Sequence, residues 1–433
     1  MIIKIWPAIV GAFTVVVSSA VYADFVGDSK ATVKYKNYYY NNDYREGGSP
    51  GKVEEWAQGL ILDLRSGYSQ GTWGVGVDSL LLFGMKLDSG RGRNKGGSMI
   101  PTDDGKAVNE WGRWGATAKF KVGETEMLYG TLQPSLPVLL TNDGRVLPQT
   151  YMGGQVTTRD VEGMVFTAGR VTRATSRAST DRTGLAITGG THASDAFLFG
   201  GVDFDVMPGL KGQYYYGELE DYYQQHFLGG IYQRPLSQGL SLKMDMRFFK
   251  TNSIGENSAG KEGFSVAGYT RDDTGKIDNT TWSTSITLGV NAHAITVGYQ
   301  SVSDQSNFVQ PAQGSLPNKG AIGSSLYLQT DRLIQSFNRA GEQTTFAQYG
   351  YDFASLGLPG LRVSTMYLKG TSIKTRSGRD QSEWERDISV DYVIQSGMVK
   401  GLGITWLNGK SHSEASRDQD QNRVFISYSV PIL

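Results

Sequence analysis

The stretch Leu240–Phe249 reads LSLKMDMRFF, and its apolar and polar side chains alternate one by one. Successive side chains of a β-strand point to opposite faces of the sheet. One face is therefore apolar, and the other carries Lys243, Asp245 and Arg247. A strand of about 10 residues is long enough to cross a membrane at a tilt. The stretch predicts a membrane-spanning strand with a charged second face.

The same period of two recurs almost everywhere along the chain, and convincing helical periodicity is absent. Near the N-terminus, Lys30–Tyr40 (KATVKYKNYYY) places Lys34 and Lys36 on its polar face. Near the end, Asn422–Val430 (NRVFISYSV) does the same with Arg423. A soluble sandwich also alternates, but its strands need not carry charge clusters over such lengths. The pattern favours an all-β transmembrane antiparallel barrel.

Composition agrees with a barrel that has a wet interior. The 433 residues are 39% hydrophobic and include 56 Gly, 23 Tyr and no Cys. The absence of Cys excludes disulfides and thiol chemistry. With 42 basic and 42 acidic residues, no net charge draws the chain toward nucleic acid.

The first 23 residues read as an export signal. Lys4 precedes the mostly apolar run Ile5–Ala20, and Val21-Tyr22-Ala23 has the small-residue pattern of a cleavage site. The alternative, a membrane anchor helix, needs about 20 residues, and the run is too short. We expect cleavage after Ala23 and one barrel over residues 24–433. After the signal no second long apolar stretch occurs, which argues against helical spans.

Short turns and long polar loops alternate between the strand-like runs, as in outer-membrane barrels. The expected short turns are Tyr68–Thr72, Val122–Glu124, Met207–Gly212, Leu236–Gly239, Asn291–His293, Ala354–Gly360 and Ser396–Gly401. The expected long loops are Asn41–Glu55, Asp88–Gly115, Pro134–Val161, Lys250–Thr280, Ser303–Gln343, Thr371–Glu385 and Ser411–Asn422.

The strand count follows from that alternation. Ser324–Thr330 resembles a strand, but counting it gives an odd total, which conflicts with the even number in single-chain bacterial barrels. Assigning it to the loop Ser303–Gln343 gives 18 strands, with short periplasmic turns, long extracellular loops and both termini on the short-turn side. The link Val171–Thr183 fits worst, because it is long where a short turn is expected.

Several longer segments resemble the OprD-type substrate-specific porins, the outer-membrane carboxylate channels. Near the N-terminus these are EEWAQGLILDLRSGYSQGTWGVGVDSLLLFGMKLDSGRGR (Glu54–Arg93), GTLQPSLPVLLTNDGRVLPQTYMGGQVTT (Gly130–Thr158) and FTAGR (Phe166–Arg170). Toward the C-terminus they are YGYDFASLGLPGL (Tyr349–Leu361), EWERDISVDYVIQSGMVKGL (Glu383–Leu402) and NRVFISYSV (Asn422–Val430). The resemblance implies an 18-stranded channel for passive diffusion of carboxylates, amino acids or small peptides across the bacterial outer membrane.

The resemblance also implies that Pro134–Gly153 folds into the barrel and narrows it. Asp143 opposite a basic wall would then set a field across the pore that orients carboxylates or zwitterions. The alternative is an ordinary Asn-Asp-Gly turn in which Asp143 and Arg145 hold each other. In one departure, Leu407 stands where the family commonly shows a basic residue, which predicts a missing rung in the basic row.

Strand parity predicts a basic ladder along the lumen. Lys34, Lys36, Arg65 and Arg423 are in lumen phase, and the first and last strands are neighbours in a closed barrel. Further pore-lining candidates are Lys243, Arg247 and Arg362. Arg386 has the wrong parity and is kept because of the resemblance. The alternative for each is pairing with lumen carboxylates, where an exposed pair contributes about 0–1 kcal/mol.

Two other classes stay open. Gly67–Gly71 (GYSQG) has the form of the G-x-S-x-G motif, so an outer-membrane hydrolase is one alternative, although no helix follows it. A plugged structural or adhesin barrel is the other. We expect no enzyme activity, no cofactor, no metal and no nucleic-acid partner. The expected partners are small anionic or zwitterionic solutes and outer-membrane lipid. A homotrimer is one assembly that porins form.

Overall fold

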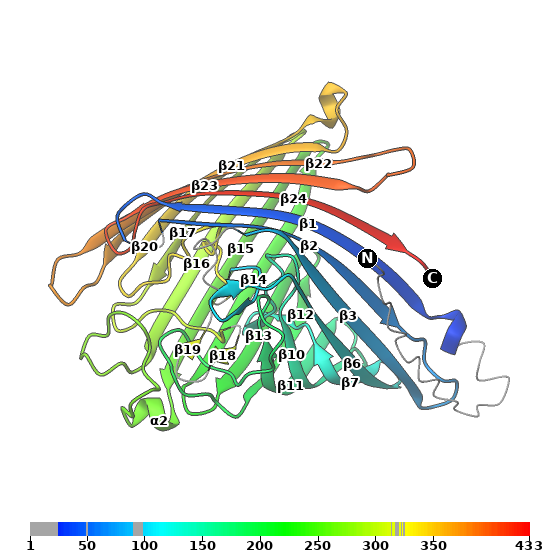
Figure 1. Cartoon of the computed structure of the whole chain (residues 1–433), viewed down its shortest axis with the longest axis horizontal. Helices are drawn as coiled ribbons and strands as arrows, with labels where there is room; N and C mark the ends of the chain where they lie inside the picture. Colours follow the sequence, from blue (N-terminus) through cyan, green and yellow to red (C-terminus); the bar gives the residue numbers. More distant parts are fainter. Residues whose placement is uncertain are drawn as a thin grey trace.

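The period of two in the sequence becomes a closed antiparallel barrel of 18 strands (Figure 1). The computed structural model describes residues 25–48, 51–89, 98–312, 314–316, 320–321, 323 and 325–433. The expected export signal, residues 1–23, lies outside them. The first nine barrel strands are β1 (Lys30–Tyr44), β2 (Lys52–Arg65), β3 (Gly74–Asp88), β6 (Glu110–Val122), β7 (Thr125–Leu132), β10 (Thr150–Thr158), β11 (Met164–Thr175), β12 (Phe197–Met207) and β13 (Leu210–Leu219). The other nine are β14 (Tyr223–Ser237), β15 (Leu240–Ser253), β16 (Asp278–Val290), β17 (His293–Val302), β20 (Gln343–Asp352), β21 (Leu361–Ile373), β22 (Gln381–Val393), β23 (Gly403–Ser413) and β24 (Gln419–Pro431).

The barrel closes between its first and last strands. Each barrel strand pairs with the next along the chain, and β24 pairs antiparallel with β1, from Thr32 opposite Pro431 to Tyr44 opposite Gln419. Closure leaves no sheet edge with unpaired backbone groups. Such groups are energetically costly in the membrane, because lipid offers no hydrogen-bond partners. The two ends of the described chain therefore lie at the same rim (Figure 1). The predicted strand number and the predicted side of the termini are confirmed.

The two rims differ in their connections. At the rim of the termini the connections are 66–73, 123–124, 159–163, 208–209, 238–239, 291–292, 353–360 and 394–402. At the other rim they are 45–51, 89–109, 133–149, 176–196, 220–222, 254–277, 303–342, 374–380 and 414–418. The second set includes all the longest connections, as predicted, together with the shorter ones 45–51, 220–222, 374–380 and 414–418. We call the second rim the outer rim.

One predicted loop is wrong over its second half. Pro134–Val161 was expected as a single loop, but the loop ends at residue 149 and β10 follows it. The sequence disguises β10, because Gly153 and Gly154 interrupt its pattern where a bulge shifts the register against β11. A side chain at Gly153 would collide with the carbonyl oxygen of Arg170. With β10 in place, the long link after β11 falls at the outer rim, which explains why Val171–Thr183 fitted poorly.

Short pieces of secondary structure lie within the loops. They are the hairpin strands β4 (Thr102–Asp103), β5 (Lys106–Ala107), β8 (Ser135–Leu136), β9 (Leu139–Leu140), β18 (Ser315–Leu316) and β19 (Gly320–Ala321), with the helix α2 (Gly255–Ser258) and the 3-10 turn η1 (Phe353–Leu356). The described part of Ser324–Thr330 contains no strand, in agreement with its assignment to a loop. Among the residues placed by the structure, no helix is long and apolar enough to cross a membrane.

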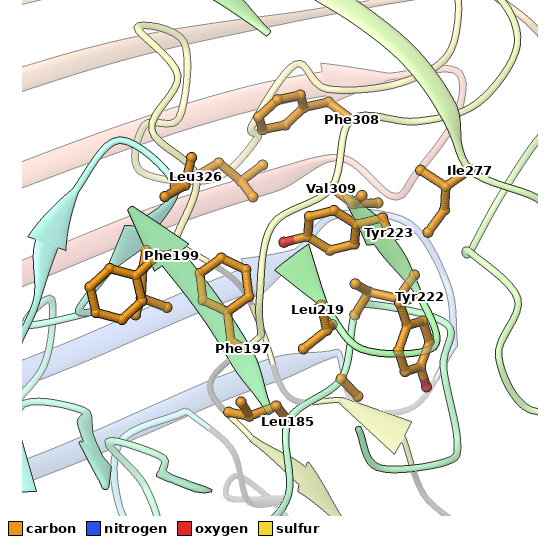
Figure 2. Packing of buried hydrophobic residues seen from close by; sticks show 14 of the residues in the cluster. Leu185, Phe197, Phe199, Leu219, Tyr222, Tyr223, Ile277, Phe308, Val309 and Leu326 are labelled. Atoms are coloured by element: carbon orange, nitrogen blue, oxygen red, sulfur yellow. The ribbon is translucent and has the colours of Figure 1, made fainter. Parts of the chain in front are cut away.

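Besides loop 133–149, which was expected inside the barrel, three further loops of the outer rim fill part of it, and the sequence did not predict these. A large apolar cluster joins the walls β12–β15 to loops 176–196, 254–277 and 303–342 (Figure 2). Its members include Leu185, Phe197, Tyr223, Ile277, Phe308 and Leu326. Tyr215, Phe227 and Phe249 lie directly opposite one another on three neighbouring strands, and their lumen-facing rings are buried in this cluster. Because the apolar lumen face binds the loops, the open passage is narrower than 18 strands alone would leave.

Candidate functional site: the pore constriction

Three arginines from separate segments meet inside the barrel. Arg145 comes from loop 133–149, Arg177 from loop 176–196 and Arg423 from β24. The guanidinium of Arg145 lies 4.5 Å from the ring centre of Tyr40, and that of Arg423 lies 5.8 Å from it. Burial lowers the pKa of Arg177 below its usual range, and the charges of Arg145 and Arg423 lower it further. We call these three residues the arginine cluster.

The arginine cluster is held by neutral acceptors. Arg145 Nη1 donates to the carbonyl oxygen of Gly144 at 2.7 Å, and Arg177 Nη1 donates to Asn142 Oδ1 at 2.8 Å. Arg423 Nε donates to Gln421 Oε1 at 2.6 Å, and its Nη2 donates to the carbonyl oxygen of Leu333. None of the three forms an ion pair with a described carboxylate.

Two buried donors of the cluster have no acceptor. Within the described part of the chain, the Nε atoms of Arg145 and Arg177 are buried without a hydrogen-bond partner. A buried unpaired donor costs about 1–3 kcal/mol, and more when the group is charged. The arginine cluster therefore has unsatisfied donors and no ion pair among the described residues, although Glu55 and Asp331 lie near enough to interact with its charge.

The tip of loop 133–149 is pinned to the barrel wall. Asp143 Oδ1 lies 2.6 Å from Lys36 Nζ on β1, and the same ammonium lies 3.4 Å from the carbonyl oxygen of Arg145. Asn142 Oδ1 accepts from the backbone N–H of Gly144 at 3.0 Å, which closes the turn. Of the two readings of this turn, the structure places Asp143 against the basic wall rather than against Arg145.

The four basic residues of the expected ladder differ in whether a carboxylate pairs with them. The register places Arg65 opposite Lys30 near the short-turn rim and Arg423 opposite Tyr40 in the outer half. Arg65 pairs with Asp63 at 3.1 Å, although few acids were expected near the ladder. Lys36 pairs with the loop, and Lys34 is exposed with no described partner. These side chains share one wall, but two of them carry a counter-charge.

The further pore-lining candidates also divide into residues with a carboxylate partner and residues without one. Arg247 pairs with Asp245 at 2.9 Å and lies over the ring of Tyr327 at 4.1 Å, so it fixes loop 303–342. Arg362 pairs with Asp352 at 3.0 Å near the short-turn rim. Lys243 is exposed and has no described partner.

Arg386 does not line the lumen. It lies opposite Tyr367 on β21 and Lys410 on β23. Tyr367 is 47% exposed on the outward face, whereas the neighbouring positions Glu385 and Asp387 are buried inside. The strand starts before Arg386, so parity directs this side chain outward, and keeping it as a pore candidate was wrong.

Functional residues that sequence reasoning missed lie mostly on loops. Arg332 and Asp331 of loop 303–342 line a cavity of about 300 Å³ against Asp387, Ser389 and other wall residues. Leu407, the expected missing rung, lines it too. Arg113 on β6 could have been found by parity, and it donates to carbonyl oxygens of loops 133–149 and 176–196. The loop arginines carried no periodic signal.

Buried carboxylates of the wall hold the loops inside. Glu385 on β22 accepts from the backbone N–H of Ile334 at 3.0 Å and of Gln335 at 2.6 Å. Glu55 on β2 accepts from the backbone N–H of Ile100 at 2.9 Å. A typical intramolecular hydrogen bond contributes about 0.5–1.5 kcal/mol. The constriction loops are therefore bonded to the wall.

The hydrolase-like motif is a turn. Gly67–Gly71 lies between β2 and β3, and Ser69 Oγ accepts from the backbone N–H of Val75 at 3.0 Å. No helix follows, so the strand–turn–helix that exposes a nucleophilic serine is absent from this described segment.

Comparison with known proteins agrees with the barrel fold. The model of the outer membrane porin, OprD family, matches residues 23–432. The chain is 30% identical over 427 residues to Porin D of Pseudomonas aeruginosa, covering 94% of this chain and 92% of that protein. It is 31% identical over 415 residues to the porin-like protein GalP of Pseudomonas putida, covering 94% and 93%.

Solved structures give the same result. The crystal structure of Pseudomonas aeruginosa OccK8 (OprE) superposes with a TM-score of 0.87 at 43% identity, covering 95% of this chain and 100% of that one. The structure of Pseudomonas aeruginosa OpdK with vanillate gives 0.82 at 30% identity, covering 94% and 100%. The chain belongs to the OprD family of outer-membrane porins, which are passive, substrate-specific channels of the bacterial outer membrane and not enzymes.

Proposed function

We propose that this porin favours small anionic or zwitterionic solutes, and that the arginine cluster binds their carboxylate at the constriction. The observation that carries the proposal is the convergence of Arg145, Arg177 and Arg423 without a described carboxylate partner, with two buried Nε atoms unsatisfied. Guanidinium groups bind carboxylates in planar, charge-assisted geometry. A narrow, low-dielectric passage strengthens that attraction.

The solute then passes from the cluster toward the periplasm along β1. Lys36 and Lys34 follow at two-residue steps on the lumen face, below Tyr40 and Tyr38. Strand residues two apart are separated by about 6.6 Å, so a carboxylate can move between successive cations without full rehydration. Arg65, with its partner Asp63, is the last member before the short-turn rim.

Carboxyl groups beside the arginine cluster favour zwitterions over dianions. Asp331 and Asp387 line the 300 Å³ cavity next to Arg332, and its lining residue Leu333 accepts from Arg423 through its carbonyl oxygen. An ammonium group can face these acids while the carboxylate faces the arginine cluster. The solved relative OpdK holds vanillate, a small aromatic monocarboxylate, which supports the anionic part of the proposal.

The proposal is tested by single-channel recording of the refolded protein in a planar bilayer, with reversal potentials in a salt gradient. We expect anion preference, and current block by vanillate but not by neutral vanillyl alcohol. Arg145→Gln combined with Arg423→Gln should remove both. The control Lys121→Gln with Lys211→Gln removes the same charge from lumen lysines that lie near the short-turn rim. Unchanged preference in the arginine variant would contradict the proposal.

A further inference from the structure

The outward face of the barrel carries a row of cations at one place near the outer rim. Lys369 on β21, Arg386 on β22 and Lys410 on β23 point to the same side as the exposed Tyr367. These three strands lie next to one another along one wall (Figure 1). We call the three residues the outer basic row.

The register brings the three side chains within reach of one ligand. Arg386 lies directly opposite Lys410, and Lys369 is two positions beyond Tyr367, the residue opposite Arg386. Directly opposite Cβ atoms are about 5 Å apart and diagonal ones about 7–8 Å. Long basic side chains at these positions can converge on one phosphate-sized anion.

The row lies at the upper edge of the apolar band. Below Arg386 on β22 the outward positions are Ile388, Val390 and Tyr392, and below Lys410 on β23 they include Trp406 and Ile404. Within the row, the ring of Trp384, opposite Lys369, stacks on Tyr367, opposite Arg386, at 6.0 Å between centroids. Aromatic side chains mark the membrane interface. The cations are therefore placed at the height of lipid headgroups.

Most other outward bases near the outer rim have carboxylate partners, which the three residues of the outer basic row lack in the part of the chain that the structure describes. Lys52 pairs with Glu54 at 2.8 Å, Lys250 with Asp278 at 2.7 Å, and Arg170 with Glu220 at 3.8 Å. Among the described residues, Lys369 and Lys410 have no hydrogen bond or ion pair, and Arg386 donates only to the neutral Asn408 Oδ1 at 2.8 Å.

The nearest outward acids are already paired. Asp420 lies opposite Lys410 in the register, but its carboxylate binds Arg45. Asp418 binds His412 at 2.7 Å. Within the described chain, the second carboxylate oxygen of Asp420 has no hydrogen-bond partner and partly compensates Lys410, whereas no carboxylate lies opposite Lys369 or Arg386 in the register.

We propose that the outer basic row binds the phosphate groups of a phosphorylated glycolipid of the outer leaflet, with the acyl chains packed on the apolar band below. The strand register sets the three cations side by side, and phosphate oxygens would supply the acceptors that the protein lacks at this place. Phosphate accepts charge-assisted hydrogen bonds from Arg and Lys.

The test measures binding of fluorescent, doubly phosphorylated lipid A to the full, delipidated barrel in detergent. The variant carries Lys369→Gln, Arg386→Gln and Lys410→Gln, and the matched control carries Lys52→Gln, Arg170→Gln and Lys250→Gln. Each interfacial cation contributes about fivefold, so the row variant should bind about 100-fold more weakly. The control should bind like the unmodified protein.

Two further arms identify the ligand chemistry. Dephosphorylated lipid A should bind far more weakly than the phosphorylated form, and millimolar inorganic phosphate should not displace the probe. Equal binding by the row variant, equal binding of dephosphorylated lipid A, or full displacement by inorganic phosphate would each overturn the proposal. Heat-modified gel mobility, which reports a folded barrel, checks that both triple variants are folded. The row is outside the pore, so ion selectivity should stay unchanged whatever the outcome.

Discussion

The arginine cluster and the outer basic row each consist of three cations, but they are built differently. The cluster takes two of its members from loops and is buried among Tyr38, Tyr40 and backbone carbonyls. The row takes all three from adjacent strands, and register alone sets its geometry. Strand parity therefore decides whether a charged side chain faces the lumen or the lipid. Loop folding decides how closely charged side chains from distant segments approach one another.

The largest expected effect is on ion selectivity, which should depend on the arginine cluster and not on the outer basic row. Removing charge from the cluster with Arg145→Gln and Arg423→Gln should lower the anion-to-cation permeability ratio by roughly tenfold, because charges in a narrow passage act through a low dielectric. Removing three charges from the outer basic row should leave this ratio unchanged. The measurement is the reversal potential of both variants in the same salt gradient. A comparable loss of anion preference in both variants would show that the two regions do not differ in function.

The second effect concerns the inward-folded loops, on which the arginine cluster depends and the outer basic row does not. Glu385→Leu removes the acceptor of Ile334 and Gln335, and each buried N–H left without an acceptor costs about 1–3 kcal/mol. Loop 303–342 should then leave the wall, with larger and noisier conductance and faster proteolysis within the loop. Glu256→Ala, in an exposed pair with Lys261, is the control. A quiet channel with unchanged proteolysis would show that other contacts suffice to hold the loop.

The third effect is a pH dependence of the lumen region. Burial raises the pKa of Asp331, so this carboxyl takes up its proton at a higher pH than an ordinary Asp. As pH falls through that raised value, the negative charge beside Arg332 is lost and anion preference should increase. Folding stability should rise over the same window, because the folded state favours the protonated form. The Asp331→Asn channel should show the anion preference of the protonated channel at every pH. If its anion preference still changes with pH, another group is responsible for the titration.

The smallest effect comes from the pinned loop tip. Asp143 is 60% exposed in its pair with Lys36, and exposed pairs contribute about 0–1 kcal/mol. Asp143→Asn should release the ammonium of Lys36 to the lumen and raise anion preference by about twofold, with little change in the thermal midpoint of unfolding. Lys34→Gln should lower the preference by a similar factor. A change of tenfold in either direction would mean that the tip positions the arginine cluster.

Much of the barrel could be predicted because a membrane enforces the period of two. Lys34, Lys36, Arg65 and Arg423 lie on one lumen wall as parity required. The strand β10 was missed because glycines replace its outward and inward side chains at a bulge. Parity also pointed Arg386 away from the lumen, and the resemblance to the family was the weaker guide for that residue.

The sequence by itself determined the closed barrel, its strand number, its two unequal rims and, outside β10, the face on which most strand residues lie. The physical reason is that every backbone group inside the lipid must be hydrogen-bonded, which a closed barrel achieves. Only the tertiary structure decided that Arg177 and Arg332 reach the constriction and that Asp143 meets Lys36. Loops have no period that fixes direction. Their positions depend on buried contacts with distant strands, such as Glu385 with Gln335, which no local pattern encodes.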